Sequence, residues 1–384
     1  MWYLNMSSLL AIAGMAIVLG LTRFWPQNKR ILLLVFNLCF IGVYSQKLAV
    51  FYIAYTLLNY AAFVWLAWLK TARFPSFLAL IAANVACVTV LRLFAMDVWQ
   101  HPWFDAVITL GLIYNVLKVI DALYFAYFIG KDAVVPIIDY ANYVLFVPTF
   151  TSGPILKFRD FMADAKQPCR VDAQAAETSV KRIILGLFKK IVLVTWMTDL
   201  FDRVGAMELT TLHSLFLMVW FYILIYFDFS GYSDIAIGFG RLMGYNIPEN
   251  FKRPFLSPTL TQYWRNWHAT LGDWFRDHIF TFAARKNPSR LTAAGLSLLI
   301  MLLIGLWHGF SWLYVAWGLY HGLLMAGENL LSQSLVNKRK VSKAYFYGRC
   351  LLTQAFVTLA VIVYCPDQEM VLKIYRGLLH LPFL

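Results

Sequence analysis

Long apolar segments recur along the whole chain of 384 residues and are separated by shorter polar segments. A membrane-spanning helix needs about 20 mostly apolar residues. Many of the apolar segments approach or reach that length, so we expect them to be transmembrane helices. The expected spans are residues 4–21, 31–44, 48–69, 77–94, 105–129, 183–197, 212–227, 291–307, 312–331 and 351–364.

The remaining apolar segment, residues 137–150, is too short for a normal span and carries Pro148 near its end, so we expect it to be re-entrant. The pattern therefore predicts an all-α polytopic membrane protein with about 10–12 membrane segments. The first apolar segment has no basic region before it and no small-residue cleavage site after it, which favours a retained span over a signal peptide. Without an internal repeat or a soluble segment of domain size, we expect a single domain over residues 1–384.

The composition supports membrane insertion, because 61% of the residues are hydrophobic and only 14% are charged. Soluble domains are about half apolar and about a quarter charged, and a soluble fold could not bury so much apolar surface. The cysteines are odd in number and lack CxxC spacing, so we expect neither a disulfide framework nor a metal site. They are Cys39, Cys87, Cys169, Cys350 and Cys365.

The formal net charge of +13 is distributed asymmetrically. If the N-terminus lies outside, most basic residues fall in cytoplasmic loops, as the positive-inside rule requires. They are concentrated between residues 157 and 190 and between residues 241 and 290, around the two hydrophilic stretches 157–181 and 243–290. This basic cytoplasmic surface suits anionic membrane lipids or an acidic cytosolic protein, and in a membrane protein it does not indicate nucleic acid.

Residues 261–282, with the sequence TQYWRNWHATLGDWFRDHIFTF, form an amphipathic pattern. At helical spacing, aromatic residues and His268 share one face while charged residues lie on the other, which predicts a helix in the membrane interface. The apolar face holds Trp264, Trp267, His268, Leu271, Trp274 and Phe275, and the polar face holds Arg265, Asp273, Arg276 and Asp277. Burial would keep the His268 imidazole neutral, although a single histidine on an apolar face is usually a packed core residue.

His308 lies between Trp307 and Gly309 at the end of a long apolar segment. An ionisable residue at membrane depth is by default a functional-site hypothesis, because an apolar residue would be cheaper to place there. The alternative is a histidine hydrogen-bonded to a neighbouring helix. Glycines at positions 305 and 309 would allow a close approach of backbone or substrate. We interpret His321, in the following span, as structural.

Three motif regions occur in a distinctive order between about residues 140 and 330. The first is PTFTSGPI at residues 148–155, and the third is WHG at 307–309 followed by GLYHG at 318–322. The second contains FDFSGYS at 227–233, PENF at 248–251, WRNWH at 264–268 and WFRD at 274–277. Their combination, order and spacing resemble the membrane-bound O-acyltransferase (MBOAT) family.

The resemblance implies a fold in which membrane, re-entrant and interfacial helices surround a central funnel. It implies that His308 and His268 are the catalytic residues, since they match the two histidines of the family motifs. Surrounding motif residues are expected to bind the substrate or the acyl donor: Trp264, Arg265, Trp267, Arg276, Trp307, Ser152 and Asn250. No bound cofactor or metal is implied, and the donor is an acyl thioester of a phosphopantetheine carrier protein or of CoA.

The resemblance also implies a multi-pass protein of the bacterial cytoplasmic membrane that acylates a cell-envelope polymer. We favour transfer of D-alanine to a polymer such as teichoic acid, and the alternative is O-acetylation of an exported polysaccharide of the alginate type. The implied partners are a DltC-like acyl carrier protein on the cytoplasmic side, a DltD-like or AlgJ/AlgX-like acyl-transfer partner outside, and membrane lipids. An alternative from another class is a transporter or flippase of an envelope precursor.

Overall fold

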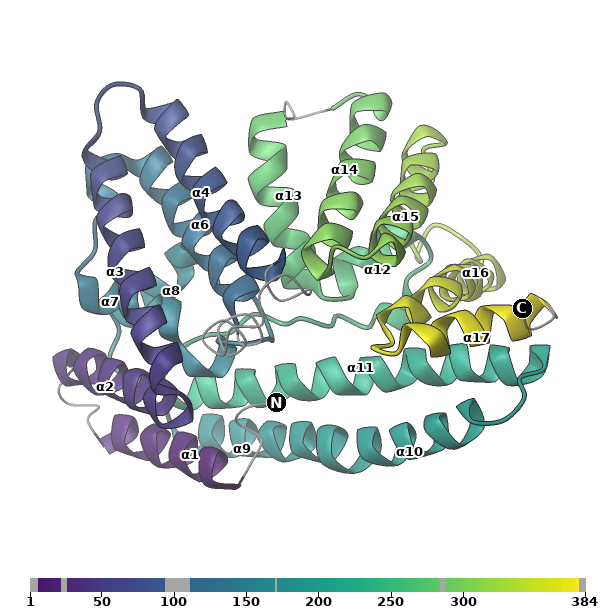
Figure 1. The fold of residues 1–384 in the computed structure, drawn as a ribbon, viewed down its shortest axis with the longest axis horizontal. Helices are drawn as coiled ribbons and strands as arrows, with labels where there is room; N and C mark the ends of the chain where they lie inside the picture. Colours follow the sequence, from purple (N-terminus) through teal and green to yellow (C-terminus); the bar gives the residue numbers. More distant parts are fainter. Residues whose placement is uncertain (1–5, 22–25, 94–110, 170, 284–287, 380–384) are drawn as a thin grey trace. The chain divides into compact units, whose positions relative to one another are not determined.

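The computed structural model describes residues 6–21, 26–93, 111–169, 171–283 and 288–379, and its regular elements in these ranges are helices (Figure 1). The chain divides into two compact units. Unit 1 comprises Met1–Ile184 and Asp234–Pro248, and unit 2 comprises Leu185–Ser233 and Glu249–Leu384. The expectation of a single domain stays a prediction.

Unit 1 is built on apolar helices that pack around a core rich in aromatic residues. Ser45 begins one of them, α3, by accepting a hydrogen bond from the Leu48 N–H, as N-cap residues do. The rings of Phe63, Tyr140 and Phe158 contact one another in the core. The helices of unit 1 are α1 (Met6–Leu21), α2 (Pro26–Tyr44), α3 (Gln46–Trp68), α4 (Arg73–Leu93), α6 (Leu112–Ile129), η2 (Gly130–Ala133), α7 (Ile137–Leu145), η3 (Val147–Thr149), α8 (Phe158–Ala165) and most of α9 (Ala173–Leu187).

The segment expected to be re-entrant forms two short helices, α7 and η3. Nine residues of α7 extend over about 14 Å at the helical rise of 1.5 Å per residue, about half the thickness of the hydrocarbon core of a bilayer. Both helices are almost entirely buried inside unit 1, where Asn142 donates to the Arg30 carbonyl and Tyr143 donates to the Leu156 carbonyl. This segment is therefore too short to cross a membrane.

Unit 2 contains the longest helix and the motif region. Polar residues cap several of its helices: Thr259 accepts from the Gln262 N–H at the start of α12, and Ser289 accepts from the Thr292 N–H at the start of α14. The helices are η4 (Phe188–Leu193), α10 (Val194–Gly205), α11 (Thr211–Leu242, which continues into unit 1), η5 (Pro254–Leu256), α12 (Leu260–Asn266), α13 (Ala269–Ala283), α14 (Arg290–His308), α15 (Trp312–Leu330), α16 (Lys343–Val361), η6 (Ile362–Tyr364) and α17 (Gln368–Leu379).

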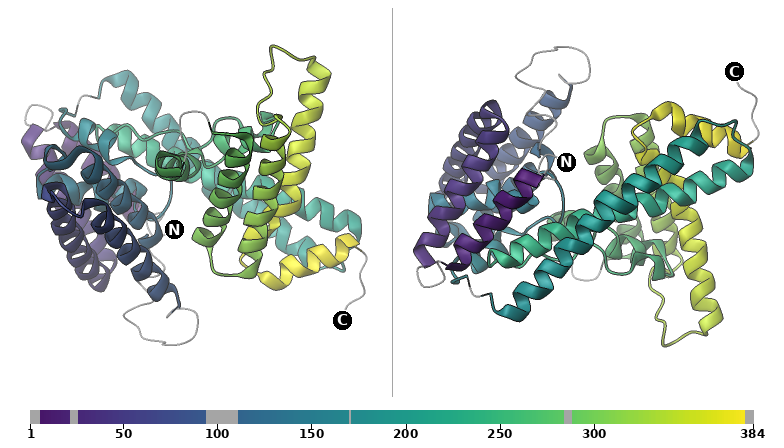
Figure 2. Two further views of the ribbon diagram at one scale, coloured as in Figure 1. Left: turned by 90° about the horizontal axis from the view of Figure 1, so that it is seen from above. Right: turned by 90° about the horizontal axis from the view of Figure 1, so that it is seen from below.

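Helices α14 and α15 lie side by side at very short range (Figure 2). A Cβ atom at Gly318 would lie 2.7 Å from the carbonyl oxygen of Met301, and one at Gly305 would collide with the carbonyl oxygen of Tyr314. Because only glycine lacks a Cβ atom, these positions allow the two backbones to touch. The close pairing fixes the end of α14, where His308 lies.

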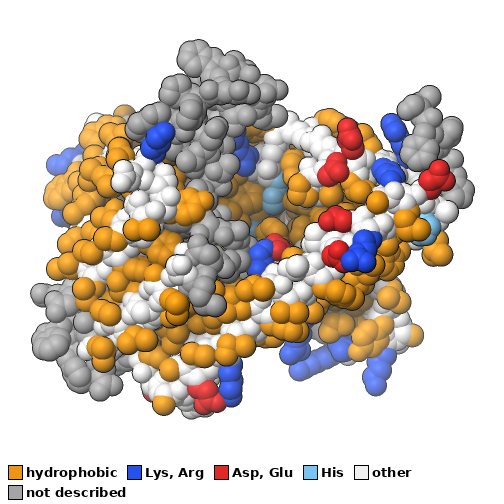
Figure 3. All heavy atoms as spheres, turned by 60° about the horizontal axis from the view of Figure 1, so that its bottom comes forward, with side chains coloured by type: hydrophobic (Ala, Val, Ile, Leu, Met, Phe, Trp, Pro, Cys, Tyr) orange, Lys and Arg blue, Asp and Glu red, His pale blue; other side chains and the backbone are white. Residues whose placement is uncertain are grey.

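The apolar helices confirm the predicted all-helical membrane protein. In the described ranges, six helices are long and apolar enough to cross a membrane, and Ser7–Leu21 is a shorter apolar helix. The six are Gln46–Trp68, Arg73–Leu93, Leu112–Ala133, Thr211–Leu242, Arg290–His308 and Lys343–Tyr364. Large apolar side chains such as Trp196 and Leu212 are exposed, and hydrophobic side chains cover much of the face drawn in Figure 3. The range of about 10–12 segments stays a prediction, and residues 4–5, 94 and 105–110 of three expected spans lie outside the described residues.

Candidate active site

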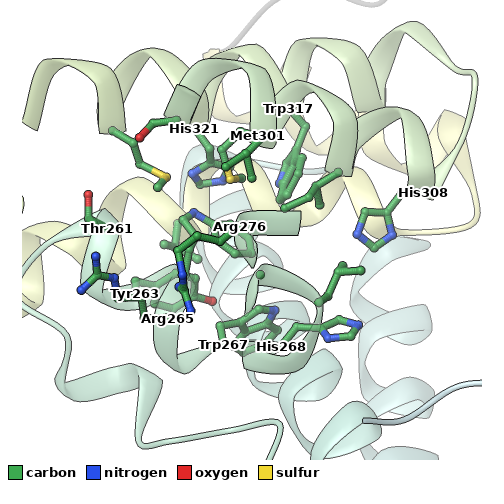
Figure 4. A pocket seen from close by; sticks show the side chains of 18 of the residues that line it. Thr261, Tyr263, Arg265, Trp267, His268, Arg276, Met301, His308, Trp317 and His321 are labelled. Carbon is green, nitrogen blue, oxygen red and sulfur yellow. The ribbon is translucent and has the colours of Figure 1, made fainter. Parts of the chain in front are cut away.

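Unit 2 encloses a cavity of about 270 Å³ that is lined by residues of α11, α12, α13, α14, α15, α16 and η6 (Figure 4). Most of its wall is apolar or aromatic, and a few polar side chains interrupt this surface, as is usual in ligand sites. His268 and His308 lie at one end of the cavity and Thr261 at the other. Among the described residues, no group of three or more His, Cys, Asp or Glu side chains is placed to hold a metal ion.

The prediction of one continuous amphipathic helix over residues 261–282 is wrong. The helix is broken into α12 and α13, with Trp267 extended and His268 in the left-handed region at φ +44°. A neighbouring strand-like segment competes for the backbone at the break: Lys252 N–H donates to the Asn266 carbonyl and Ala269 N–H donates to the Asn250 carbonyl. These bonds replace helical ones and turn His268 out of the helical path.

A left-handed conformation costs a non-glycine residue of order 1–3 kcal/mol and persists only where the surroundings impose it. At His268 the surroundings are the hydrogen bonds of Asn250, whose side-chain oxygen accepts from Thr270 N–H at 3.3 Å and from the Thr270 hydroxyl at 2.9 Å. The same oxygen lies 3.1 Å from His268 Nδ1. Strained residues of this kind cluster at functional sites.

The contacts of Asn250 identify the tautomer of His268. Because the Thr270 N–H can only donate, the atom of Asn250 that it contacts is the amide oxygen, which can only accept. Nδ1 of His268 therefore carries the proton and donates it to this oxygen. Nε2 is then an unprotonated acceptor, and it has no hydrogen-bond partner among the described residues. His268 thus presents one unused lone pair.

His268 is buried, with 5% of its surface exposed. Burial lowers the pKa of His268 to about 4, from an ordinary value of 6.5, because desolvation disfavours the charged imidazolium. The imidazole is therefore neutral at physiological pH. This agrees with the state that the sequence predicts for it.

His308 is the last residue of α14 and lines the same cavity. The ring of Trp307 contacts both histidines, with ring centroids 4.7 Å from His308 and 6.3 Å from His268. Tyr364 also packs against the His308 ring, with centroids 4.7 Å apart. The structure therefore brings together the two histidines that the motifs single out, although forty residues separate them in the chain.

The other residues expected at the site fall into three groups. Trp264, Arg265, Trp267 and Arg276 line the cavity, whereas Asn250 and Trp307 contact its histidines. Ser152 belongs to unit 1, in the turn that follows η3. Its assignment stays a prediction, and the substrate roles of the other six do as well.

The two cavity arginines have different partners. Arg276 forms ion pairs with Asp273 at 2.5 Å and with Asp277 at 3.9 Å. Arg265 makes no hydrogen bond or ion pair to the other side chains that the structure describes. Partial burial lowers the pKa of Arg265, the charge of Arg276 lowers it further, and Asp273 opposes both. Arg265 is thus a cation available to a ligand.

Two residues line the cavity although the sequence did not predict them there, and the structural interpretation of His321 stays a prediction. His321, interpreted as structural, lines the cavity between the rings of Trp264 and Trp317, at 5.0 Å from each. Its Nδ1 and the Trp264 Nε1 have no hydrogen-bond partner within the described part of the chain. Tyr364 lies beyond all the motifs, in a span recognised only by its hydropathy, so no sequence signal connected it with His308.

Known proteins resemble this chain over most of its length. The model of the MBOAT, membrane-bound O-acyltransferase family, matches residues 45–343. Probable alginate O-acetylase AlgI of Pseudomonas fluorescens is 33% identical over 223 residues, which are 58% of this chain and 45% of the relative. Teichoic acid D-alanyltransferase of Bacillus subtilis is 28% identical over 269 residues, covering 64% of this chain and 67% of the relative.

Peptidoglycan O-acetyltransferase of Helicobacter pylori is 29% identical over 252 residues, which cover 64% of this chain and 47% of that relative. The match thus spans under half the length of the alginate and peptidoglycan relatives. The family model nevertheless covers well over half of the present chain and includes His268 and His308. The chain belongs to the membrane-bound O-acyltransferase family.

Proposed function

We propose that this protein is an O-acyltransferase of the bacterial cytoplasmic membrane, which transfers an acyl group from a thioester to a hydroxyl of a cell-envelope polymer. The observation that carries the proposal is the pairing of His268 and His308 at one end of a single cavity. The family membership and the names of the relatives support it. None of these relatives is named as a transporter.

Acyl transfer to a hydroxyl requires a base for the hydroxyl proton and donors for the negative charge that develops on the carbonyl oxygen. We assign the base to His308. The hydroxyl oxygen attacks the thioester carbon while its proton passes to His308, and the proton then leaves with the thiolate when the carbon–sulfur bond breaks. Because Nε2 of His268 is an acceptor, it suits orienting the incoming hydroxyl and cannot itself donate to the oxyanion.

The donor is proposed to be an acyl thioester on a phosphopantetheine carrier protein or on CoA, both of which are anionic. Arg265 on the cavity wall supplies positive charge for it, and Lys252 and Arg253 are exposed on the segment before α12. We place an acidic acyl carrier protein at this surface, which we assign to the cytoplasmic side. A further acyl-transfer partner would act on the outer side.

Two acyl groups are considered for the reaction. D-alanyl is the group that the sequence motifs favour, and a D-alanyltransferase is among the relatives. Acetyl is supported by the acetylase relatives. Competing D-alanyl and acetyl thioesters of pantetheine, supplied to the purified protein with a polymer acceptor, would show which ester forms.

Substitution of His308 tests the proposed function in cells. His308→Gln keeps much of the size and hydrogen bonding of the side chain but removes its basicity, and losing a general base lowers a rate by about 10²- to 10⁴-fold. We expect normal amounts of the variant in the membrane and an envelope polymer almost free of ester-linked acyl groups. Near-wild-type ester content at equal protein abundance would remove His308 from the mechanism and reopen the transporter alternative.

A further inference from the structure

Aromatic rings surround His308 on several sides. Trp307 and Tyr364 are the nearest, each with its ring centroid 4.7 Å from that of the imidazole. The centroids of Trp317 and Tyr314 lie 6.0 and 6.1 Å away. The Tyr364 ring is nearly perpendicular to the imidazole, at 81°. Tyr364 also lines the cavity, so its side chain lies where the proposed reaction would occur.

The position of Tyr364 is fixed by its surroundings. It ends the short helix η6, whose turn is closed by the Cys365 N–H donating to the Ile362 carbonyl at 2.9 Å. The buried ring of Trp317 packs edge-on against Tyr364, with centroids 5.2 Å apart. A side chain held in this way is preorganised, and preorganised donors stabilise transition-state charge most effectively.

Tyr263, another phenol of the cavity wall, has already committed its proton. Gln354 donates through its side-chain nitrogen to the Pro254 carbonyl, which leaves its side-chain oxygen to accept from the Tyr222 hydroxyl at 2.7 Å. The single proton of Tyr222 is thereby used. The 3.1 Å contact between the Tyr222 and Tyr263 hydroxyls then requires Tyr263 to be the donor, away from the cavity.

Tyr364 differs from Tyr263 in this respect. No hydrogen bond joins the Tyr364 hydroxyl to another residue within the described part of the chain. A phenol is protonated at neutral pH, since its ordinary pKa is about 10. Tyr364 therefore offers an uncommitted neutral donor beside His308.

We propose that Tyr364 is a catalytic residue that donates a hydrogen bond to the carbonyl oxygen of the donor thioester, an inference that rests on the acyl transfer proposed above. As the acceptor hydroxyl adds to the thioester carbon, the carbonyl electrons move onto oxygen, and the Tyr364 O–H stabilises that negative charge without transferring its proton. When the oxyanion collapses, the carbonyl re-forms and the carbon–sulfur bond breaks. The thiolate takes the proton held by His308, so His308 and Tyr364 both return to their initial states.

Tyr364→Phe is the matched test, because it keeps the ring against His308 and removes only the donor. Removing one oxyanion donor lowers kcat by about 10²- to 10³-fold. We expect a loss of this size in the single-turnover rate of ester formation, with the KM for the thioester close to that of the wild type. The control is Tyr375→Phe on α17, whose hydroxyl donates to the Leu359 carbonyl at 2.7 Å and does not line the cavity. Its transfer rate should be close to that of the wild type.

The outcomes separate this inference from the function on which it rests. A wild-type protein that forms no ester from a pantetheine thioester would contradict the proposed function. An active wild type with an equally active Tyr364→Phe variant would overturn the catalytic role of Tyr364 and leave the proposed function standing. Tyr364→Leu, which removes the ring as well, measures the packing contribution, and a loss confined to this variant would also overturn the donor role.

Discussion

Two positively charged side chains, Lys29 in unit 1 and Arg265 in unit 2, have opposite surroundings. Lys29 is 1% exposed. Its ammonium donates to the carbonyls of Asp164, Gln167 and Gly244, each at 3.2 Å, and lies 4.2 Å from the centre of the Tyr245 ring. Arg265 lines a cavity and makes no such bonds to the described side chains. The chain satisfies one cation completely and leaves the other for a ligand.

Hydrogen-bond acceptors in unit 2 also differ in whether they have a partner. The Glu328 carboxylate accepts from the Leu260 N–H, the Thr261 N–H and the Thr261 hydroxyl, and so it holds the start of α12 in place. Nε2 of His268, at the end of the same segment, is buried without a partner among the described residues. A buried polar atom without a partner costs about 1–3 kcal/mol. Such an atom at a cavity is explained by a ligand or water that completes it.

Of the substitutions at the two cations, we expect replacement of Lys29 to have the larger effect, and this effect is on stability. Lys29→Met would remove the donor shared by three carbonyls, of which only that of Asp164 keeps another among the described residues, the Gln167 N–H, and each buried unpaired group costs about 1–3 kcal/mol. We expect a clearly lower apparent melting temperature in detergent and less protein in the membrane, with an unchanged KM for the thioester in the protein that folds. A melting temperature equal to that of the wild type would show that Lys29 does not stabilise unit 1.

Arg265→Gln should weaken binding of the donor and leave the stability of the protein almost unchanged. Loss of the cation should raise the KM for an anionic phosphopantetheine thioester about 5-fold, because a partly exposed charge pair contributes about 1 kcal/mol. The melting temperature and kcat should change little, and added salt should reduce the difference from the wild type. Arg203→Gln, on α10, is the control, since Arg203 already pairs with Asp199 at 3.0 Å. Equal KM values for the two variants would remove Arg265 from donor binding.

The smallest effect at neutral pH concerns the titration of His268. Its pKa is about 4 in the folded protein and about 6.5 when unfolded, so the unfolded state binds more protons between these values. Stability should therefore fall as the pH is lowered from 6.5 to 4. The fall should be smaller in His268→Gln, because glutamine does not titrate in this range. The test is to measure the melting temperatures of the wild type and of His268→Gln over this pH interval. Parallel curves of melting temperature against pH would argue against a buried neutral His268.

The sequence predicted the features that depend on local pattern. The apolar segments that it identified are helices in the structure. His268 and His308 could be identified because each lies in a short motif. The break at Trp267 and His268 was not predicted, because it depends on backbone bonds to Asn250 and Lys252 that amphipathic periodicity does not encode. Tyr364 was missed for a similar reason, since its contact with His308 arises only when η6 packs beside α14.

The most direct measurement of the central claim is single-turnover acyl transfer by the purified protein in lipid vesicles, from an acyl-pantetheine thioester to a polymer hydroxyl. In the wild type, loss of thioester and formation of ester should proceed at the same rate and in equal amounts. His308→Gln should lower both by about 10²- to 10⁴-fold while still binding the thioester. Ester formation by His308→Gln at the wild-type rate would contradict the assignment of this cavity as the site of transfer.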